Sequence, residues 1–164
     1  MKKCIILQIN YLILICLFIP CVAIAQPICQ IQRFSAYNGL AQRSVTNILQ
    51  DSKGFIWFST WNGLNKFDGY TFKNYKAFPG DGCTLTSNRF AKITQTQTCD
   101  IWCQTYDERV YLFDSRRERF IDILRPYEDQ RHQSYAVQNI YTLPKGISWI
   151  VCNRGAFRID EQIY

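Results

Sequence analysis

The chain has 164 residues, of which 48% are hydrophobic, 20% charged and 15% aromatic, and its formal net charge is +6. This apolar content excludes intrinsic disorder, and five prolines without a glycine period exclude a collagen-like or low-complexity chain. A single histidine, His132, argues against a multi-histidine metal site or a histidine phosphorelay in this chain. The abundance of Trp, Tyr and Phe favours strands, so we expect a β-rich binding or structural module.

The first 25 residues have the pattern of an export signal. Lys2 and Lys3 precede an apolar run over 4–19, and the Ala-Ile-Ala sequence that ends at Ala25 supplies the small residues of a cleavage site. We therefore predict a signal-peptide helix over residues 1–25 and a periplasmic mature protein. The alternative is an uncleaved membrane anchor, because the apolar stretch is long enough to span a bilayer.

The rest of the chain gives no sign of a cofactor, metal or nucleic acid. Its charges form no basic run, which makes nucleic acid a poor partner. The cysteines that follow the leader have the spacing of neither a disulfide framework nor a zinc site. We expect all of them to be buried as small hydrophobic residues: Cys29, Cys83, Cys99, Cys103 and Cys152.

One motif recurs three times after the leader. Each copy has an isoleucine nine residues before a tryptophan and an aspartate eleven or twelve residues after it, and the copies follow one another at about 45 residues. Three coincidences of residue type and spacing are hard to obtain by chance. The nine residues are Ile48, Trp57 and Asp68, then Ile93, Trp102 and Asp114, then Ile140, Trp149 and Asp160.

The first copy has the pattern of four short strands. They are expected over 44–50, 55–58, 64–67 and 70–75, and the Asp68-Gly69 pair between the last two is a tight hairpin signal. No stretch shows ten residues of helical periodicity. Four-stranded antiparallel units repeated at this interval are what a β-propeller requires. We predict an all-β fold, a partial β-propeller of about two and a half four-stranded blades after the signal-peptide helix.

The propeller interpretation assigns structural roles to the recurring residues. A sheet that is apolar on both faces must stack against its neighbours, so the three tryptophans should pack between blades. The three aspartates should accept backbone N–H bonds in turns. Residues 31–37 repeat the Phe and Tyr spacing of the outer strand of the first copy, and we expect them to form an unpaired or mispaired strand. The predicted divisions are an N-terminal strand and lead-in over 26–43 and blades over 44–87, 88–134 and, incomplete, 135–164.

Three segments of the first copy carry a family resemblance. They closely resemble the two-component regulator propeller repeat. The segments are YNGLAQRSV at 37–45, ILQDSKGFIW at 48–57 and TWNGLNKFDGY at 60–70. The resemblance is specific over 34–75, weaker over 88–124, and limited to the Trp-to-Asp frame over 135–160.

The resemblance implies the periplasmic sensor half of a hybrid two-component system of Bacteroidetes. In that family two propellers precede an immunoglobulin-like domain, an inner-membrane helix, a histidine kinase and a receiver. The implied function is detection of an oligosaccharide that controls polysaccharide-utilisation genes, and the implied partners are that ligand, the remaining blades, the signalling domains and a second copy in a homodimer.

The chain ends at Tyr164, inside the third copy, and has no kinase sequence. We interpret it as an amino-terminal fragment of such a receptor, without enzymatic activity of its own. Two alternatives stay open: a secreted propeller that binds or scaffolds, and a fragment of a polysaccharide-degrading propeller enzyme. The enzyme would need converging carboxylates, whereas Asp107 and Glu108 are adjacent and would point to opposite faces of a strand.

A ligand surface is expected at one rim of the propeller, where loops enter the inner strands and join the second and third strands. Exposed aromatic rings there can stack on sugar C–H faces, amides can satisfy hydroxyls, and arginine can take a carboxylate or sulfate. The alternative is that these are ordinary polar turn residues. The candidates are Arg43, Trp61, Asn62, Asn88, Arg89, Tyr106, Asn153 and Arg154.

Overall fold

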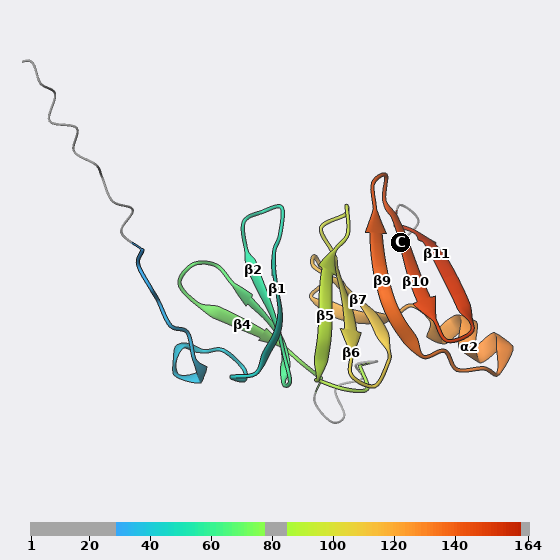
Figure 1. Ribbon diagram of the computed structural model, residues 1–164, viewed down its shortest axis with the longest axis horizontal. Helices are drawn as coiled ribbons and strands as arrows, with labels where there is room; N and C mark the ends of the chain where they lie inside the picture. The colour runs from blue at the N-terminus through green and yellow to red at the C-terminus, as the bar shows by residue number, and fades with distance from the viewer. Residues whose placement is uncertain (1–28, 78–84, 162–164) are drawn as a thin grey trace, which may run out of the picture. The chain divides into compact units, whose positions relative to one another are not determined.

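The computed structural model describes residues 29–77 and 85–161, which form three antiparallel sheets (Figure 1). The predicted signal-peptide helix lies outside these residues. Blade 1 contains β1 (Val45–Gln50), β2 (Ile56–Thr60), β3 (Gly63–Phe67) and β4 (Phe72–Tyr75). Blade 2 contains β5 (Phe90–Gln95), β6 (Ile101–Thr105), β7 (Val110–Asp114) and β8 (Arg119–Asp122). Blade 3 contains β9 (Val137–Leu143), β10 (Ile147–Cys152) and β11 (Gly155–Asp160).

Within each blade, strands that are consecutive in the sequence are also neighbours in the sheet. The first strands of the three blades, β1, β5 and β9, lie side by side (Figure 1). Blades 1 and 2 have four strands each, and blade 3 has three within the described residues. The all-β fold with a partial set of propeller blades is therefore confirmed.

The recurring tryptophan holds consecutive blades together. Trp57 and Trp102 are each only 1% exposed, and both project from the second strand of a blade toward the next blade. The Trp57 ring meets that of Phe113 in blade 2 at 5.5 Å. The Trp102 indole N–H donates to Ser148 Oγ in blade 3 at 2.9 Å, and the Trp57 indole N–H donates to Asp51 Oδ2 at 2.8 Å. Each indole therefore buries a large apolar surface and satisfies its one donor.

The central sheet is buried on both faces. All five residues of β7 are buried, because alternate side chains enter the core shared with blade 1 and the core shared with blade 3. This explains the continuous apolar runs of the sequence, which would not suit a sheet with one face in water.

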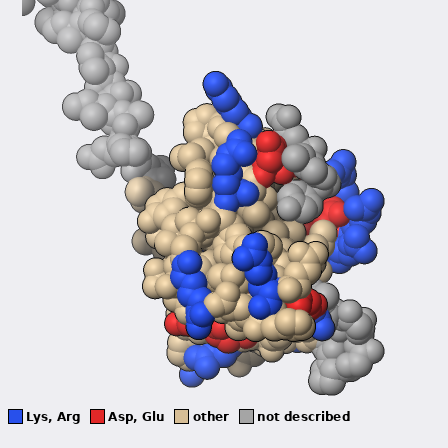
Figure 2. All heavy atoms as spheres, turned by 90° about the vertical axis from the view of Figure 1, so that its right-hand side faces the viewer, with Lys and Arg blue, Asp and Glu red and all other residues tan. Residues whose placement is uncertain are grey.

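The outer face of blade 3 differs from the other two Trp-bearing faces. Trp149 occupies the repeat position of Trp57 and Trp102 but is 36% exposed, and its neighbours Tyr141 and Leu143 are 52% and 46% exposed. Figure 2 looks onto this side of the molecule, where uncharged residues lie between scattered Lys and Arg side chains. No further sheet covers this face within the described part of the chain.

The N-terminal strand expected over residues 31–37 is not formed. Residues 29–35 have no regular secondary structure, and a 3-10 turn, η1, spans Ala36–Asn38. The Ser35 N–H donates to Asn38 Oδ1 at 3.0 Å, and this local bond competes with strand pairing. The segment instead packs on blade 1 through Phe34, whose ring lies 4.8 Å from that of Phe67.

A short helix, α2 (Arg125–Arg131), links blades 2 and 3 and was not predicted. It has seven residues, too few for a helical period to show in the sequence, and begins with a proline at its first turn.

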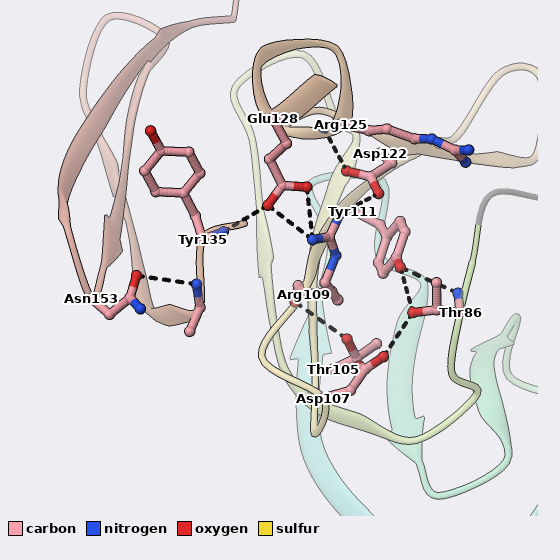
Figure 3. A network of polar contacts seen from close by, with 11 residues as sticks. Thr86, Thr105, Asp107, Arg109, Tyr111, Asp122, Arg125, Glu128, Tyr135 and Asn153 are labelled. Atoms are coloured by element: carbon pink, nitrogen blue, oxygen red, sulfur yellow. Dashed lines mark hydrogen bonds and ion pairs between the residues drawn. The ribbon is translucent and has the colours of Figure 1, made fainter. Parts of the chain in front are cut away.

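Arg109 fixes this helix to blade 2 (Figure 3). Its guanidinium contacts Asp122 Oδ2 at 2.9 Å and Glu128 Oε2 at 2.8 Å, and Glu128 Oε1 also accepts the Tyr135 N–H at 2.8 Å. Burial lowers the pKa of Arg109, but the bonds to Asp122 and Glu128 raise it by more, so the net pKa lies above its ordinary value. One cation thus joins β7, β8, α2 and the lead-in to β9.

Two of the recurring aspartates form the expected kind of turn. Asp68 Oδ1 accepts the N–H groups of Tyr70 and Thr71, and these bonds lower the pKa of Asp68. Asp114 Oδ1 accepts the N–H groups of Arg116 and Arg117. Burial raises the pKa of Asp114, but its bonds to these two arginines lower it overall.

The cysteines are only partly buried. Cys103 and Cys152 are buried, whereas Cys99 is half-buried and Cys29 is exposed. The expectation of burial was therefore wrong for the last two, because one lies in a turn and the other precedes the first blade; Cys83 lies outside the described residues. No helix within 29–77 or 85–161 has the length and apolar character needed to cross a membrane.

The blade 1–blade 2 seam also contains an exposed ion pair. Lys73 Nζ lies 2.5 Å from Glu118 Oε2, and the Tyr75 hydroxyl donates to Glu118 Oε1 at 2.9 Å. The bond from Lys73 and then that from Tyr75 lower the pKa of Glu118 below its ordinary 4.5.

Replacing the tryptophans tests the stacking arrangement. We expect Trp102→Ala to lower the free energy of unfolding by about 3–5 kcal/mol, because it opens a cavity and leaves the Ser148 hydroxyl without its donor. Trp149→Ala should cost less than about 1 kcal/mol, since its ring is already partly in water. Urea unfolding followed by circular dichroism measures both; equal losses would contradict the assignment.

Removing the central cation should uncouple α2. Arg109→Gln leaves Asp122 and Glu128 close together without a cation, so we expect a loss of about 2–4 kcal/mol in the same unfolding measurement. The matched control is Arg117→Gln, because Arg117 is 70% exposed in its pair with Asp114 and should contribute little. A loss in the control as large as that in Arg109→Gln would disprove the special role of Arg109.

The exposed seam pair predicts a pH dependence. Since the folded pKa of Glu118 is lowered, its ionised form stabilises the fold above the unfolded value near 4.5, and this stabilisation is lost as the pH falls through the folded pKa. The stability difference between the wild type and Glu118→Gln should therefore be positive at pH 7, below about 1 kcal/mol, and vanish in acid. Thermal unfolding from pH 7 to pH 3 measures it, and a difference that grows in acid would contradict the sign.

Candidate functional site: an aromatic cluster at the rim

Three of the predicted rim residues come together between blades 1 and 2. The Arg89 guanidinium carbon lies 4.8 Å from the centre of the Trp61 ring and 5.5 Å from that of Tyr106. The two rings meet edge to face, with centroids 6.2 Å apart and planes at 83°. We call these three residues the rim cluster.

The rim cluster is open to solvent. Trp61 is 44% exposed and Tyr106 is 51% exposed, whereas the tryptophans of β2 and β6 are 1% exposed. Arg89 is exposed as well. Single exposed aromatic residues are common on protein surfaces, but a contiguous group of them indicates a binding site. Exposing such a group to water costs free energy, and the fold does not need the exposure.

A two-residue hairpin loop presents Trp61. Thr60 pairs with Gly63 in the β2–β3 ladder, which leaves Trp61 and Asn62 in the loop. Gly63 has φ of +117°, and a Cβ there would lie 2.8 Å from the Tyr75 carbonyl oxygen, so the close approach requires glycine. The Gly63 N–H donates to the Asn88 carbonyl at 2.8 Å, which ties the loop to the start of blade 2.

The β6–β7 loop presents Tyr106 in the same direction. Its backbone N–H donates to the Arg89 carbonyl at 2.9 Å, so the residue that carries the guanidinium is bound to the loop that carries the ring. The loop closes through Glu108, which has φ of +60° and donates its N–H to the Thr105 carbonyl at 3.1 Å. The backbone thus holds Arg89 and Tyr106 together before any ligand arrives.

Asp107 in this loop is exposed, and its side chain bonds Thr86. Its Oδ2 accepts the Thr86 hydroxyl at 2.7 Å, and Thr86 also bonds the Tyr111 hydroxyl at 2.8 Å (Figure 3). Thr86 and Tyr111 were not predicted as part of the site. The Thr-Ser-Asn sequence before Arg89 is the one signal that could have indicated them, because such residues bond local backbone groups.

The other predicted rim residues lie elsewhere or serve the backbone. The Asn88 amide both accepts from the Ala77 N–H, at 2.7 Å, and donates to the Ala77 carbonyl, at 2.9 Å, so it holds the link between the blades. Asn153 Oδ1 accepts the Ala136 N–H at 3.3 Å in blade 3 (Figure 3). In the described part of the chain, no hydrogen bond or cation–π contact joins the rim cluster to the side chains of Arg43, Asn62, Asn153 or Arg154.

The chemistry available at the rim cluster is binding. Two rings, a phenol hydroxyl and a guanidinium offer stacking surfaces and hydrogen-bonding groups, which suit the binding of a polar ligand. Within the residues that the structure describes, no group of three His, Cys, Asp or Glu side chains is placed to hold a metal ion.

Comparison with known proteins identifies the repeat. The family model described as "Two component regulator propeller" matches residues 39–62, which include the Trp61 loop. Residues 39–62 are thus similar to the two-component regulator propeller repeat. A curated relative, histidine kinase P4 of Formosa agariphila, is 47% identical over 53 residues, which are 32% of this chain and 4% of that protein.

Solved structures agree with the propeller fold. The extracellular domain of a putative hybrid two-component system from B. thetaiotaomicron matches with a TM-score of 0.65 and 26% identity, over 80% of this chain and 19% of that one. A second extracellular domain, of a putative one-component system from the same organism, matches with a TM-score of 0.57 and 20% identity, over 81% and 19%. This propeller-repeat chain thus spans about a fifth of the length of the structures it matches.

The geometry predicts that the rim cluster connects the two blades energetically. Tyr106→Ala removes one of the two rings against Arg89 and should cost about 0.5–1.5 kcal/mol. A double-mutant cycle with Trp61→Ala, followed by urea unfolding, measures the coupling between the two rings. Strict additivity would show that the rings do not interact in solution.

Proposed function

We propose that this chain belongs to the periplasmic ligand-sensing propeller of a hybrid two-component regulator and binds oligosaccharides at the rim cluster. The observation that carries the proposal is the meeting of two exposed aromatic rings and an arginine, from three loops of two blades, in a chain with the two-component regulator propeller repeat.

The residue types suit a sugar. Its C–H faces pack on aromatic rings, and its hydroxyls accept hydrogen bonds from N–H donors. Rings set at 83° to each other can contact two faces of one residue or two successive residues of a chain. A flat stacking surface formed by one ring would offer less selectivity.

The position of the cluster suits a sensor. Trp61 belongs to blade 1, whereas Arg89 and Tyr106 belong to blade 2, so a ligand that contacts all three spans the seam between blades. A ligand shifts a conformational equilibrium only through its different affinity for two states, and a seam is where such a difference can arise. In the longer protein the remaining blades, the kinase and a second copy would receive this change.

Calorimetric titration of the purified chain with a panel of neutral and acidic oligosaccharides tests the proposal. We expect one class to bind and Trp61→Ala to weaken its binding about tenfold or more, because a stacking surface is lost. Trp149→Ala is the matched control: it removes another exposed tryptophan, outside the rim cluster, and should leave binding unchanged. Binding that survives Trp61→Ala, or that is lost equally in the control, would contradict the assignment.

A further inference from the structure

Arg89 is the charged member of the rim cluster, and its side-chain N–H groups are unused within the described residues. Its guanidinium carbon lies 4.8 and 5.5 Å from two ring centres, which engages the faces of the guanidinium plane. Within residues 29–77 and 85–161, no oxygen accepts a hydrogen bond from its side-chain N–H groups and no carboxylate lies within ion-pair distance. Its backbone N–H alone is bonded, to Ser87 Oγ at 3.2 Å.

Other arginines near the seams are satisfied differently. Arg109 has two carboxylates, at 2.8 and 2.9 Å, and Arg117 has one, at 3.2 Å. Fixing a long side chain costs rotamer entropy, so an exposed arginine that two rings hold, and that no anion contacts within the described residues, is already organised for one. The fork of N–H groups at the edge of its plane matches the geometry of a carboxylate or a sulfate.

We propose that the rim cluster selects a negatively charged oligosaccharide, whose carboxylate or sulfate group binds the edge of the Arg89 guanidinium while Trp61 and Tyr106 contact the sugar. This inference rests on the proposed function and adds the charge of the ligand to it. The net charge of +6, which becomes +4 when the predicted leader with Lys2 and Lys3 is removed, favours approach of an anion, though only weakly at physiological salt.

Two acidic residues, Asp107 and Glu108, follow Tyr106 in the same loop. Asp107 Oδ2 is held by the Thr86 hydroxyl at 2.7 Å, so its carboxylate is directed to Thr86 and not to Arg89. Glu108 is exposed and forms no ion pair within the described residues. These two carboxylates disfavour a highly charged ligand, so a single anionic group placed at Arg89 fits the loop better than a polyanion.

The experiment is calorimetric titration of the full chain with oligosaccharides of matched length. One set is neutral, one carries uronic-acid carboxylates and one carries sulfates; inorganic sulfate and acetate are titrated separately. We expect one acidic set to bind at least about tenfold tighter than the neutral set, because charge-assisted bonds to a guanidinium are about twice as strong as neutral ones. The free ions alone should bind far more weakly, since they lack the stacked sugar.

Two variants and a control assign the preference to Arg89. Arg89→Gln should abolish the preference, so that the acidic and neutral sets then bind within about twofold of each other, and Arg89→Lys should retain a part of it, because lysine keeps the charge but loses the fork. The control is Arg131→Gln, since Arg131 also stacks on a ring, that of Tyr127 at 5.1 Å, but lies in α2. Circular dichroism and the unfolding midpoint show whether each variant is folded.

The outcomes separate the two proposals. Neutral oligosaccharides that bind as tightly as acidic ones, or a preference that persists in both Arg89 variants, would overturn the charge selection and leave the sugar site standing. Inorganic sulfate that binds as tightly as the sulfated set would also overturn it, since the sugar would then contribute nothing. Absence of binding by every oligosaccharide would overturn the proposed function itself.

Discussion

The structure depends on one contact, the burial of an indole from the second strand of blade 1 and of blade 2 against the next sheet. A four-stranded sheet with apolar residues on both faces cannot remain alone in water, because each face exposes several large side chains. Trp57 and Trp102 solve this problem in the same way, each at 1% exposure, and each places its N–H on an oxygen. This contact holds consecutive blades side by side, and the rim loops of blades 1 and 2 meet across the same seam.

The polar part of the seams complements the apolar part. The Trp102 N–H reaches Ser148, the Ser148 hydroxyl bonds Glu161, and Glu161 Oε2 accepts the Gln97 N–H at 2.9 Å, so a buried carboxylate is satisfied by donors from both blades. At the other end of the same seam the cation of Arg109 is paired with two carboxylates, those of Asp122 and Glu128. Unpaired buried groups would be costly, and these networks make the relative position of two blades specific as well as stable.

Much of this could be predicted from the sequence, because the fold repeats. The recurring Ile, Trp and Asp residues predicted where the blades lie. The pairing of Thr60 with Gly63 confirms the predicted turn at Trp61 and Asn62. The features that the sequence did not predict have no periodic signal: the seven-residue helix α2, and the turn at Ser35 that replaces the expected strand. The site was predicted only in part for the same reason. The eight predicted rim residues are all polar or aromatic loop residues, and the sequence does not show which of them meet. Only the structure shows that the Asn88 amide is hydrogen-bonded to the Ala77 backbone, whereas the Arg89 guanidinium stacks on two rings.

Trp61 and Trp149 show why exposure has to be interpreted together with position. Both are partly exposed tryptophans, at 44% and 36%. Trp149 lies at a repeat position whose equivalents are sealed by a neighbouring blade, so its exposure reflects a stacking face without a cover in the described residues. Trp61 lies in a loop outside every seam core, so no additional blade in the stack would bury it as Trp57 is buried. Its exposure therefore belongs to the rim itself, and the stacking that stabilises the blades leaves this ring available to a ligand.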